Sequence, residues 1–197
     1  MKVGVLALQG DFREHLATLH TLGAQACEVK TLEQLQSVDA LVIPGGESTT
    51  MNKLAIAFGL MQPIRTRISD GMPVYGSCAG MIMLANTIQD PASGQESFGG
   101  LDIVVRRNAF GRQVDSFEAD LAINGIQGAP MRAIFIRAPW VESYSQAVDV
   151  LASVEVDGAS HPVAIQQGKL LATSFHPEIS GDNRVHRYFL EEICQKA

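Results

Sequence analysis

Residues 73–80 read PVYGSCAG, a short apolar run that ends in a turn where one cysteine stands two residues from a glycine on each side. Similar apolar runs occupy residues 2–8, 24–29 and 40–43, and helix-like spacing of apolar side chains follows each of them. The longest of these helical segments is predicted over residues 48–69. Strands that alternate with helices pair in parallel. The sequence therefore predicts an α/β fold with a mostly parallel central sheet flanked by helices.

The second half of the chain has a different pattern, in which short strand-like runs are separated by turn residues. These runs span residues 101–105, 116–123, 133–136, 148–156, 162–166 and 170–175. We expect them to form an antiparallel extension and returning strands of the same sheet. A final helix follows, with one apolar face made by Val185, Tyr188, Phe189 and Ile193. Because no repeat or break in composition interrupts the chain, we expect a single domain over residues 1–197.

Composition and charge narrow the functional classes. The 197 residues are 46% hydrophobic and 18% charged, as in a globular protein. A net charge of -6, without a run of Lys or Arg, disfavours nucleic acid as a partner. The sequence contains no run of eighteen consecutive apolar residues, the length that a membrane-spanning helix needs. The first residues do not have the form of a secretory signal. We therefore expect a cytoplasmic protein without a membrane segment.

The cysteines and histidines do not have the spacing of a metal site. Cys27, Cys78 and Cys194 are odd in number and far apart, so we expect free thiols in place of disulfides or zinc ligands. Asp11 and His15 are one helical turn apart and are predicted to be a helix start and a surface pair. We expect no metal and no cofactor.

Cys78 has the features of a nucleophile. Gly76-Ser77-Cys78-Ala79-Gly80 has the form G-x-C-x-G between a strand and a helix, the thiol counterpart of a nucleophile elbow. The glycines leave room for the neighbouring strand and helix, and the helix N-terminus favours a thiolate. A buried cysteine in a glycine-rich turn is the alternative. The presence of a suitable base elsewhere in the chain distinguishes a nucleophile from a buried cysteine.

His176-Pro177-Glu178 supplies such a base. A thiol nucleophile needs an imidazole, and the imidazole needs an acidic group to orient it. We predict that these residues end a strand, where side chains two apart face the same side, so that His176 and Glu178 point together towards Cys78. Cys78, His176 and Glu178 are the predicted catalytic triad.

Residues 44–48, PGGES, add a glycine pair between the third strand and the next helix. Glycine lets backbone N–H groups approach a ligand closely. If this loop lies beside the cysteine, the N–H groups of Gly46 and Ala79 form an oxyanion hole. A phosphate-binding turn is disfavoured because the Lys of a P-loop and a G-x-G-x-x-G motif are both missing.

Taken in order, PGGES, GSCAG and HPE resemble the class I, or triad-type, glutamine amidotransferases. Residues 7–15 (ALQGDFREH), 44–50 (PGGESTT) and 107–113 (RNAFGRQ) are most similar to the glutaminase subunit of the two-component pyridoxal 5'-phosphate synthase. Ala109 is a departure, because many relatives have Ser there. The resemblance implies an α/β fold and a glutaminase that supplies ammonia for vitamin B6 biosynthesis.

The resemblance also implies a substrate site and a partner. L-glutamine would lie against Gly46, Glu47, Ser48, Arg107, Ile136 and Arg137. The free amino acid has an α-carboxylate that needs a cation, and either Arg107 or Arg137 can provide it. The partner would be a pyridoxal 5'-phosphate synthase subunit, which would contact the chain near Gln9 and the first helix.

Two alternatives remain open at the level of sequence. One is another enzyme of this chemistry: a glutaminase subunit for imidazole glycerol phosphate or anthranilate synthesis, or a cysteine hydrolase that acts on γ-glutamyl compounds. The other is a non-catalytic regulatory module of the same fold. A module of that kind has no need of an intact triad.

Overall fold

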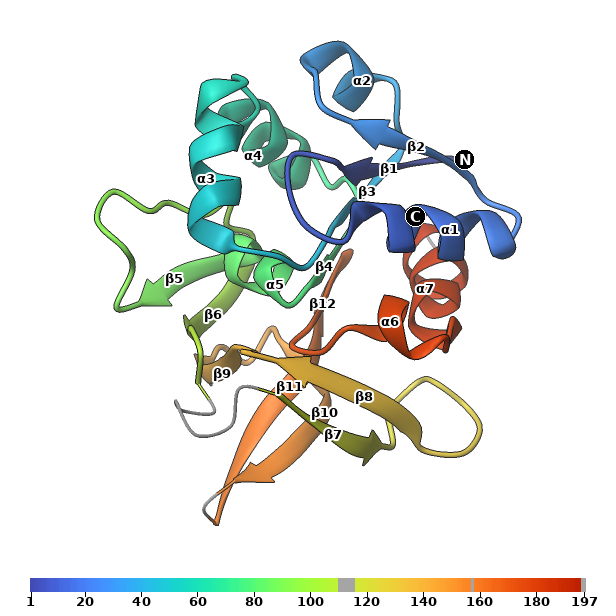
Figure 1. The fold of residues 1–197 in the computed structure, drawn as a ribbon, viewed down its shortest axis with the longest axis vertical. Helices are drawn as coiled ribbons and strands as arrows, with labels where there is room; N and C mark the ends of the chain where they lie inside the picture. The colour runs from blue at the N-terminus through green and yellow to red at the C-terminus, as the bar shows by residue number, and fades with distance from the viewer. Residues whose placement is uncertain (110–115, 157, 196–197) are drawn as a thin grey trace.

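The computed structural model describes residues 1–109, 116–156 and 158–195 (Figure 1). The helices are α1 (Phe12–Thr21), α2 (Leu32–Gln36), α3 (Ser48–Ala57), α4 (Met61–Ser69), α5 (Ala79–Leu84), α6 (Pro177–Ser180), α7 (Arg184–Tyr188) and the π-helix η1 (Phe189–Cys194). The strands are β1 (Lys2–Leu6), β2 (Gln25–Val29), β3 (Ala40–Ile43), β4 (Val74–Ser77), β5 (Ala85–Gln89), β6 (Leu101–Arg106), β7 (Ser116–Leu121), β8 (Met131–Ile136), β9 (Trp140–Tyr144), β10 (Asp149–Val156), β11 (Ala159–Gln167) and β12 (Leu170–Thr173).

A seven-stranded sheet in the order β10-β11-β12-β4-β3-β1-β2 forms the centre of the molecule. The pairs β12–β4, β4–β3, β3–β1 and β1–β2 are parallel. Strands β10, β11 and β12 pair antiparallel at the other side. The predicted α/β fold with a mostly parallel sheet and an antiparallel extension is confirmed.

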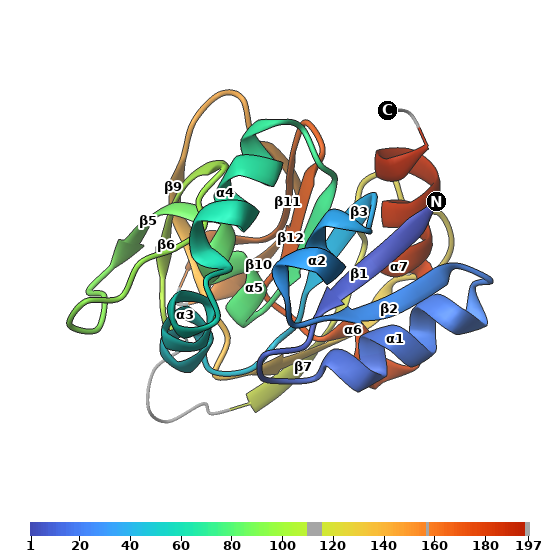
Figure 2. The same cartoon turned by 90° about the horizontal axis from the view of Figure 1, so that it is seen from above.

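Alternating side chains along the central strands build one core on each face of the sheet. On β3, Ala40 and Val42 face the core under α1, α7 and η1, whereas Leu41 and Ile43 face the core under α3, α4 and α5. All four residues are fully buried. Figure 2 shows these two groups of helices on opposite sides of the sheet. A central strand covered on both faces needs a continuous apolar run, which residues 40–43 provide.

The structure corrects the predicted arrangement of the second half. Residues 101–105 belong to a separate three-stranded sheet, β5-β6-β9, and β7 and β8 pair only with each other among the described residues. Strands β5 and β9 were not predicted. Strand β5 follows α5 without a turn residue between them, and its burial does not alternate. Pairing between distant strands is decided by tertiary contacts that periodicity does not report.

The helical segment predicted over residues 48–69 is two helices. It breaks after α3 at Gly59, whose φ of 68° is a left-handed conformation suited to glycine. None of the helices in the described part of the chain has the length and apolar character needed to cross a bilayer.

Four connections meet at the carboxyl ends of the parallel strands. They follow β1, β3, β4 and β12, and they lead into α1, α3, α5 and α6. In open α/β sheets this edge is where ligands bind. All three residues of the predicted triad lie in or directly after two of these connections.

Candidate active site

The cysteine sits on a strained turn between β4 and α5. Cys78 has φ 47° and ψ -102°, which is an unusual conformation for a residue other than glycine. A Cβ atom on Gly76 would lie 2.5 Å from the carbonyl carbon of Gly80, and one on Gly80 would collide with the carbonyl oxygen of Ile43. The two glycines are therefore required by the close approach of strand and helix, as the sequence predicted. The Cys78 N–H donates to the Thr173 carbonyl at 2.7 Å, which ties the turn to β12.

His176 lies beside this cysteine and links it to an acid. Its side chain lines the same cavity as Cys78, and its Nδ1 lies 2.7 Å from Oε1 of Glu178. The N–H of His176 donates to the Ile134 carbonyl of β8 at 2.9 Å. Strand β8 also places the Ile136 carbonyl 3.9 Å from the Cys78 Sγ. The structure thus brings the three predicted residues together at one place.

The local geometry at this place differs from the predicted one. Strand β12 ends at Thr173, and His176 caps the short helix α6, in which Glu178 occupies the first turn. The expectation of an extended segment with both side chains on one face is wrong. Pro177 explains the difference, because proline at the first helical position starts a helix. The first turn then carries the Glu178 carboxylate back to the imidazole.

Opposing effects set the charge of the imidazole. Burial by itself lowers the pKa of His176, but the hydrogen bonds to Cys78 and Glu178 and the charges of both groups raise it to about 10. Burial raises the pKa of Glu178, and the hydrogen bond and charge of His176 lower it. At neutral pH His176 is therefore an imidazolium held between a sulfur and a carboxylate.

Asp11 is a second carboxylate at this imidazole. Its Oδ2 lies 3.6 Å from the Nδ1 of His176, and its side chain is 39% exposed. Asp11, His176 and Glu178 place one donor atom each within 4.8 Å of the others. Two ligands of a tetrahedral zinc ion at about 2.0 Å each are about 3.3 Å apart, so the 2.7 Å between His176 and Glu178 has the length of a hydrogen bond.

The loops after β1 and β3 are hydrogen-bonded to one another next to the triad. The Asp11 N–H donates to the Gly45 carbonyl at 3.2 Å, and the Glu47 N–H donates to Oε1 of Gln9 at 2.8 Å. A side chain on Gly10 would collide with the Gly45 carbonyl. Since the Gly45–Gly46 peptide is trans, the Gly46 N–H points away from the Asp11 backbone. Ala79 is the first residue of α5, where backbone N–H groups have no acceptor within the helix.

These parts surround a cavity of about 450 Å³, within the usual range for small-molecule sites, about 300–1,000 Å³. The predicted site residues that line it are Gly46, Glu47, Ser48, Cys78, Arg107, Ile136, Arg137 and His176. Ala79 and Glu178 lie behind Cys78 and His176. Gln9, Asp11, Ile82, Asn108 and Ile179 also line the cavity. The cavity brings together residues of six separate segments.

Arg107 is held in place from two sides. Its Nη1 donates to Oε1 of Gln95 at 2.7 Å, and its Nη2 lies 3.4 Å from Oε1 of Glu47. Gln95 in turn donates to the Ser48 hydroxyl at 3.0 Å. Glu47 accepts the N–H groups of Thr49 and Thr50, and although partial burial opposes the shift, these bonds lower its pKa to about 2. A guanidinium beside a fixed carboxylate and a hydroxyl suits a free amino acid, which has an anionic α-carboxylate and a cationic α-ammonium group.

The chain matches one protein family over residues 5–195. It belongs to the SNO glutamine amidotransferase family. As a member of this family, the protein is a glutamine amidotransferase, and the resemblance seen in the sequence is confirmed.

Relatives of the family are similar over almost the whole chain. A Streptomyces coelicolor protein named pyridoxal 5'-phosphate synthase subunit PdxT is 60% identical over 97% of this chain and 93% of its own length. An Acidothermus cellulolyticus protein of the same name is 59% identical over 100% of this chain and 95% of its own length. A solved structure described as glutamine amidotransferase is 48% identical, with a TM-score of 0.87, and 98% of each chain is covered.

A more distant structure shares the fold alone. It is described as a putative GMP synthase protein from Thermoplasma acidophilum, with 18% identity and a TM-score of 0.67, and 100% of this chain and 94% of that chain are covered. This glutamine amidotransferase therefore shares its fold with a protein of dissimilar sequence.

Some residues near the site of this amidotransferase were not found from sequence. Gln95 was not singled out from the sequence, because nothing in its spacing marks it. His15 was predicted to be on the surface, but it is fully buried, and its Nε2 lies 3.0 Å from Oγ of Ser77. A signal was available, because His15 is four residues before the buried Leu19 and so lies on the apolar face of α1. Within residues 107–113, the part from 110 to 113 lies outside the described residues.

Proposed function

We propose that this chain hydrolyses L-glutamine to L-glutamate and ammonia through a thioester on Cys78, and that it supplies the ammonia to a pyridoxal 5'-phosphate synthase subunit for vitamin B6 biosynthesis. The observation that carries the proposal is the His176 side chain, which lines the cavity together with Cys78 and is bonded through Nδ1 to Glu178. A thiol, an imidazole and an orienting acid are the parts that acyl transfer requires.

In the first half of the reaction, the Cys78 sulfur attacks the side-chain amide carbon of glutamine. The carbonyl electrons move to oxygen, and the N–H groups of Gly46 and Ala79 stabilise that oxyanion. His176 gives its proton to the amide nitrogen as the carbon–nitrogen bond breaks. Ammonia leaves, and glutamate is held as a thioester.

In the second half, water replaces ammonia. His176, now neutral, takes a proton from water while the oxygen attacks the thioester carbon. The carbon–sulfur bond breaks, glutamate leaves and the thiolate forms again. Glu178 holds the imidazole in place and stabilises its charged form in both halves.

The charged groups of free glutamine have partners in the cavity. Arg107 is oriented by Gln95 and Glu47, and we assign it to the α-carboxylate. The Glu47 carboxylate and the Ser48 hydroxyl are acceptors for the α-ammonium group. Arg137, Ile136 and Gly46 complete the wall. These assignments place all substrate contacts in one domain, residues 1–197.

The choice of pyridoxal 5'-phosphate synthase as the partner rests on the names of the relatives, which are similar to this chain over almost its whole length. A synthase for imidazole glycerol phosphate or anthranilate would receive ammonia by the same chemistry. We place the partner contact near Gln9 and α1, where the loop after β1 meets the loop after β3. Cys27, Cys78 and Cys194 are free thiols, which accords with a reducing compartment, and we place the protein in the cytoplasm.

Thiol substitution tests the proposal. Cys78→Ser is expected to abolish ammonia release from glutamine, whereas Cys27→Ser and Cys194→Ser are expected to keep activity within a few-fold. Burial raises the pKa of Cys194 to about 12, which leaves it a poor nucleophile. A glutamine-like electrophile should label Cys78 in peptide mass spectrometry. A label found mainly on Cys27 or Cys194 would refute the assignment.

The partner is tested separately. Mass spectrometry of the proteins that co-purify with the tagged chain is expected to find a pyridoxal 5'-phosphate synthase subunit. Recovery of a different synthase in its place would leave the glutaminase chemistry standing and would correct the partner.

A further inference from the structure

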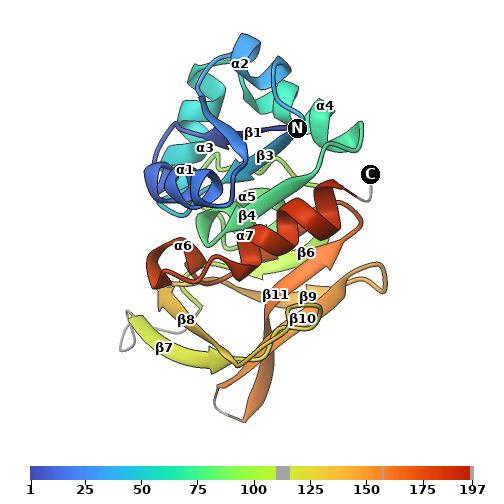
Figure 3. The same cartoon turned by 90° about the vertical axis from the view of Figure 1, so that its right-hand side faces the viewer.

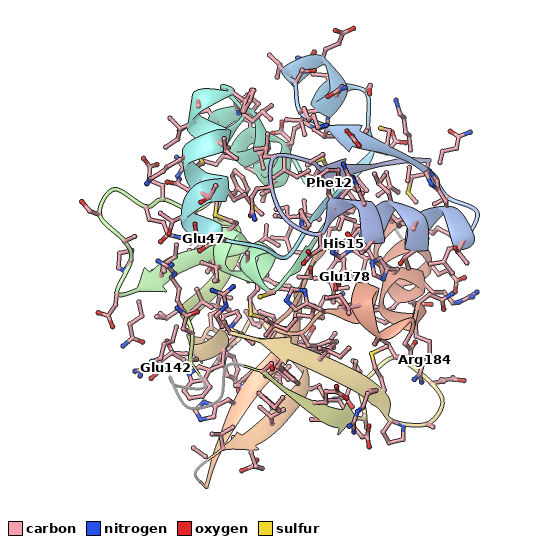
Figure 4. All side chains as sticks on the ribbon, in the orientation of Figure 1. Phe12, His15, Glu47, Glu142, Glu178 and Arg184 are labelled. Carbon is pink, nitrogen blue, oxygen red and sulfur yellow. The ribbon has the colours of Figure 1, made fainter. Side chains whose placement is uncertain are left out.

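Next to the proposed triad lies a buried polar cluster that the reaction scheme does not use. It consists of His15 on α1, Ser77 on β4 and His186 on α7, which are all fully buried, and it borders Glu178. The Nδ1 of His15 lies 2.8 Å from Nε2 of His186. The Nε2 of His15 lies 3.0 Å from Oγ of Ser77 and 3.5 Å from Oε2 of Glu178. Figure 4 shows His15 and Glu178 side by side between α1 and α6.

Glu178 needs a second donor. Its side chain has no exposed surface, and Oε1 is already bonded to His176. Its Oε2 makes no hydrogen bond to another described residue. A buried carboxylate oxygen without a donor is costly, because ionisation then has to be supported without water. The Nε2 atom of His15 lies 3.5 Å from Oε2, which is within ion-pair distance.

The proton positions follow from the contacts. Burial lowers the pKa of His15 and lowers that of His186 to about 4, so both rings are neutral at neutral pH. One of the two facing nitrogens must then donate and the other accept. If His15 Nδ1 donated, its bare Nε2 lone pair would face the Glu178 carboxylate. If His186 Nε2 donates, His15 carries its proton on Nε2 and presents an N–H to Ser77 and Glu178.

The second arrangement is favoured on two grounds. It replaces repulsion between a lone pair and a carboxylate by attraction at 3.5 Å. It also leaves Nδ1 of His186, which has no hydrogen-bond partner among the described residues, as a bare acceptor in place of a buried unpaired N–H. Unpaired buried acceptors are better tolerated than unpaired buried N–H groups.

We propose that His15 is a positioning residue of the glutaminase: in its Nε2–H form, fixed by His186, it holds Oε2 of Glu178 so that Oε1 keeps His176 aligned with Cys78. The inference rests on the proposed function, because its effect is exerted on the proposed triad. It explains why α1 carries a histidine on its buried face. It also connects the helix expected to contact the partner to the acid of the triad.

Kinetics of four variants test the proposal: His15→Leu, His15→Gln, Glu178→Gln and the combination of His15→Leu with Glu178→Gln. His15→Leu is expected to lower kcat about 10- to 100-fold while KM changes less than about three-fold. His15→Gln, whose amide N–H reaches the position of Nε2, is expected to recover most of kcat. In the Glu178→Gln background, His15→Leu is expected to cost less than about three-fold further. Effects that multiply independently, or a His15→Leu enzyme with wild-type kcat, would overturn it.

A measurement without glutamine separates this inference from the proposed function. Nitrogen-15 NMR of labelled histidines in the wild-type chain is expected to find His15 neutral with its proton on Nε2. A proton on Nδ1, or an imidazolium, would overturn the proposal even if the enzyme is active. An Nε2–H signal in a chain that releases no ammonia from glutamine would retain the arrangement and reject the proposed function. Thermal unfolding of each variant verifies that it is folded.

Discussion

Gly45 lies directly against the ring of His176. A Cβ atom at residue 45 would come within 2.8 Å of the ring Nδ1, would collide with Cε1 and would lie 3.2 Å from Oδ2 of Asp11. The two contacts with the ring are shorter than a real Cβ atom makes, so the absence of a side chain at Gly45 is what allows the imidazole to occupy its position. The first glycine of the PGGES motif is therefore a steric requirement of the base, in addition to any role of the loop in binding an oxyanion.

Gly45→Ala should accordingly lower turnover. We expect a loss of about 100-fold in kcat, because a displacement of about 1 Å in a catalytic group costs about that much. The measurement is steady-state ammonia release at saturating glutamine. Gly168→Ala, in the turn between β11 and β12, is the control: nothing lies within 4 Å of an added Cβ there, its φ of 55° adds only backbone strain far from the triad, and kcat should stay at the wild-type value. Equal kcat in both variants would show that the ring tolerates the methyl group.

Glu178→Gln should lower kcat more than it weakens glutamine binding, because the acid orients the imidazole and stabilises its charged form but does not line the cavity. Asp11 lies 3.6 Å from the same Nδ1 and is expected to retain part of that support. The combination of Glu178→Gln with Asp11→Asn should therefore lose more activity than Glu178→Gln alone, and His176→Ala should lose the most. If Glu178→Gln kept full kcat in the assembled enzyme, the triad would reduce to a Cys-His pair.

Arg107→Gln should raise KM for glutamine about 10- to 100-fold with a smaller change in kcat. A charged hydrogen bond to the α-carboxylate is worth about 1.5–3 kcal/mol, and it is made to the bound substrate and the transition state alike. Arg132→Gln is the matched control, since Arg132 pairs with Glu118 and Asp120 on the outer surface of β7 and β8. A wild-type KM for Arg107→Gln would transfer the role to Arg137.

The part of this structure that sequence could predict is the part fixed by local chemistry. The turn at Gly76-Ser77-Cys78-Ala79-Gly80 was found because short contacts demand glycine at fixed positions. The Cys78, His176 and Glu178 set followed from what a thiol nucleophile needs. The placement of β6 away from the main sheet did not follow, since strand pairing at long range depends on which edges remain open. The partners of His15, Ser77 and His186, could not be predicted, because they are 62 and 171 residues away.

Stability should fall on the acid side of neutrality because of His186. Burial lowers its folded pKa to about 4, whereas an unfolded histidine titrates near 6.5. Between these values the unfolded chain binds a proton and the folded chain does not, so the unfolding free energy decreases as pH falls through this window. The full shift corresponds to about 3 kcal/mol. Urea unfolding at several pH values should show the wild type losing about that much more than His186→Gln between pH 7 and pH 4. Parallel pH curves for the two proteins would contradict it.

The synthase partner should accelerate glutamine hydrolysis. The Gly45 carbonyl and the Glu47 N–H are hydrogen-bonded to Asp11 and Gln9, so a protein that binds near Gln9 acts on the peptide that carries the Gly46 N–H. Glycine allows that peptide to rotate at low steric cost. Ammonia release should rise when the partner is added, and by reciprocity glutamine should tighten the association of the two proteins.

Calorimetric titration of the partner, with and without glutamine, measures this coupling in a His176→Asn variant that cannot turn over. Equal activity with and without the partner, together with association that ignores glutamine, would exclude the coupling. The triad chemistry would be unaffected by that result.

The position of β12 in the middle of the sheet has a consequence for biosynthesis. In Figure 3, α7 lies in front of the sheet near β4, and β12 lies between β11 and β4 in the strand order. While residues 170–178 are still inside the ribosome, β4 is an open sheet edge and Cys78 has neither the Thr173 carbonyl nor the imidazole beside it. Cys78 therefore gains the Thr173 carbonyl and the His176 imidazole only after residues 170–178 have left the ribosome, so the thiol of the nascent chain is without its base until then.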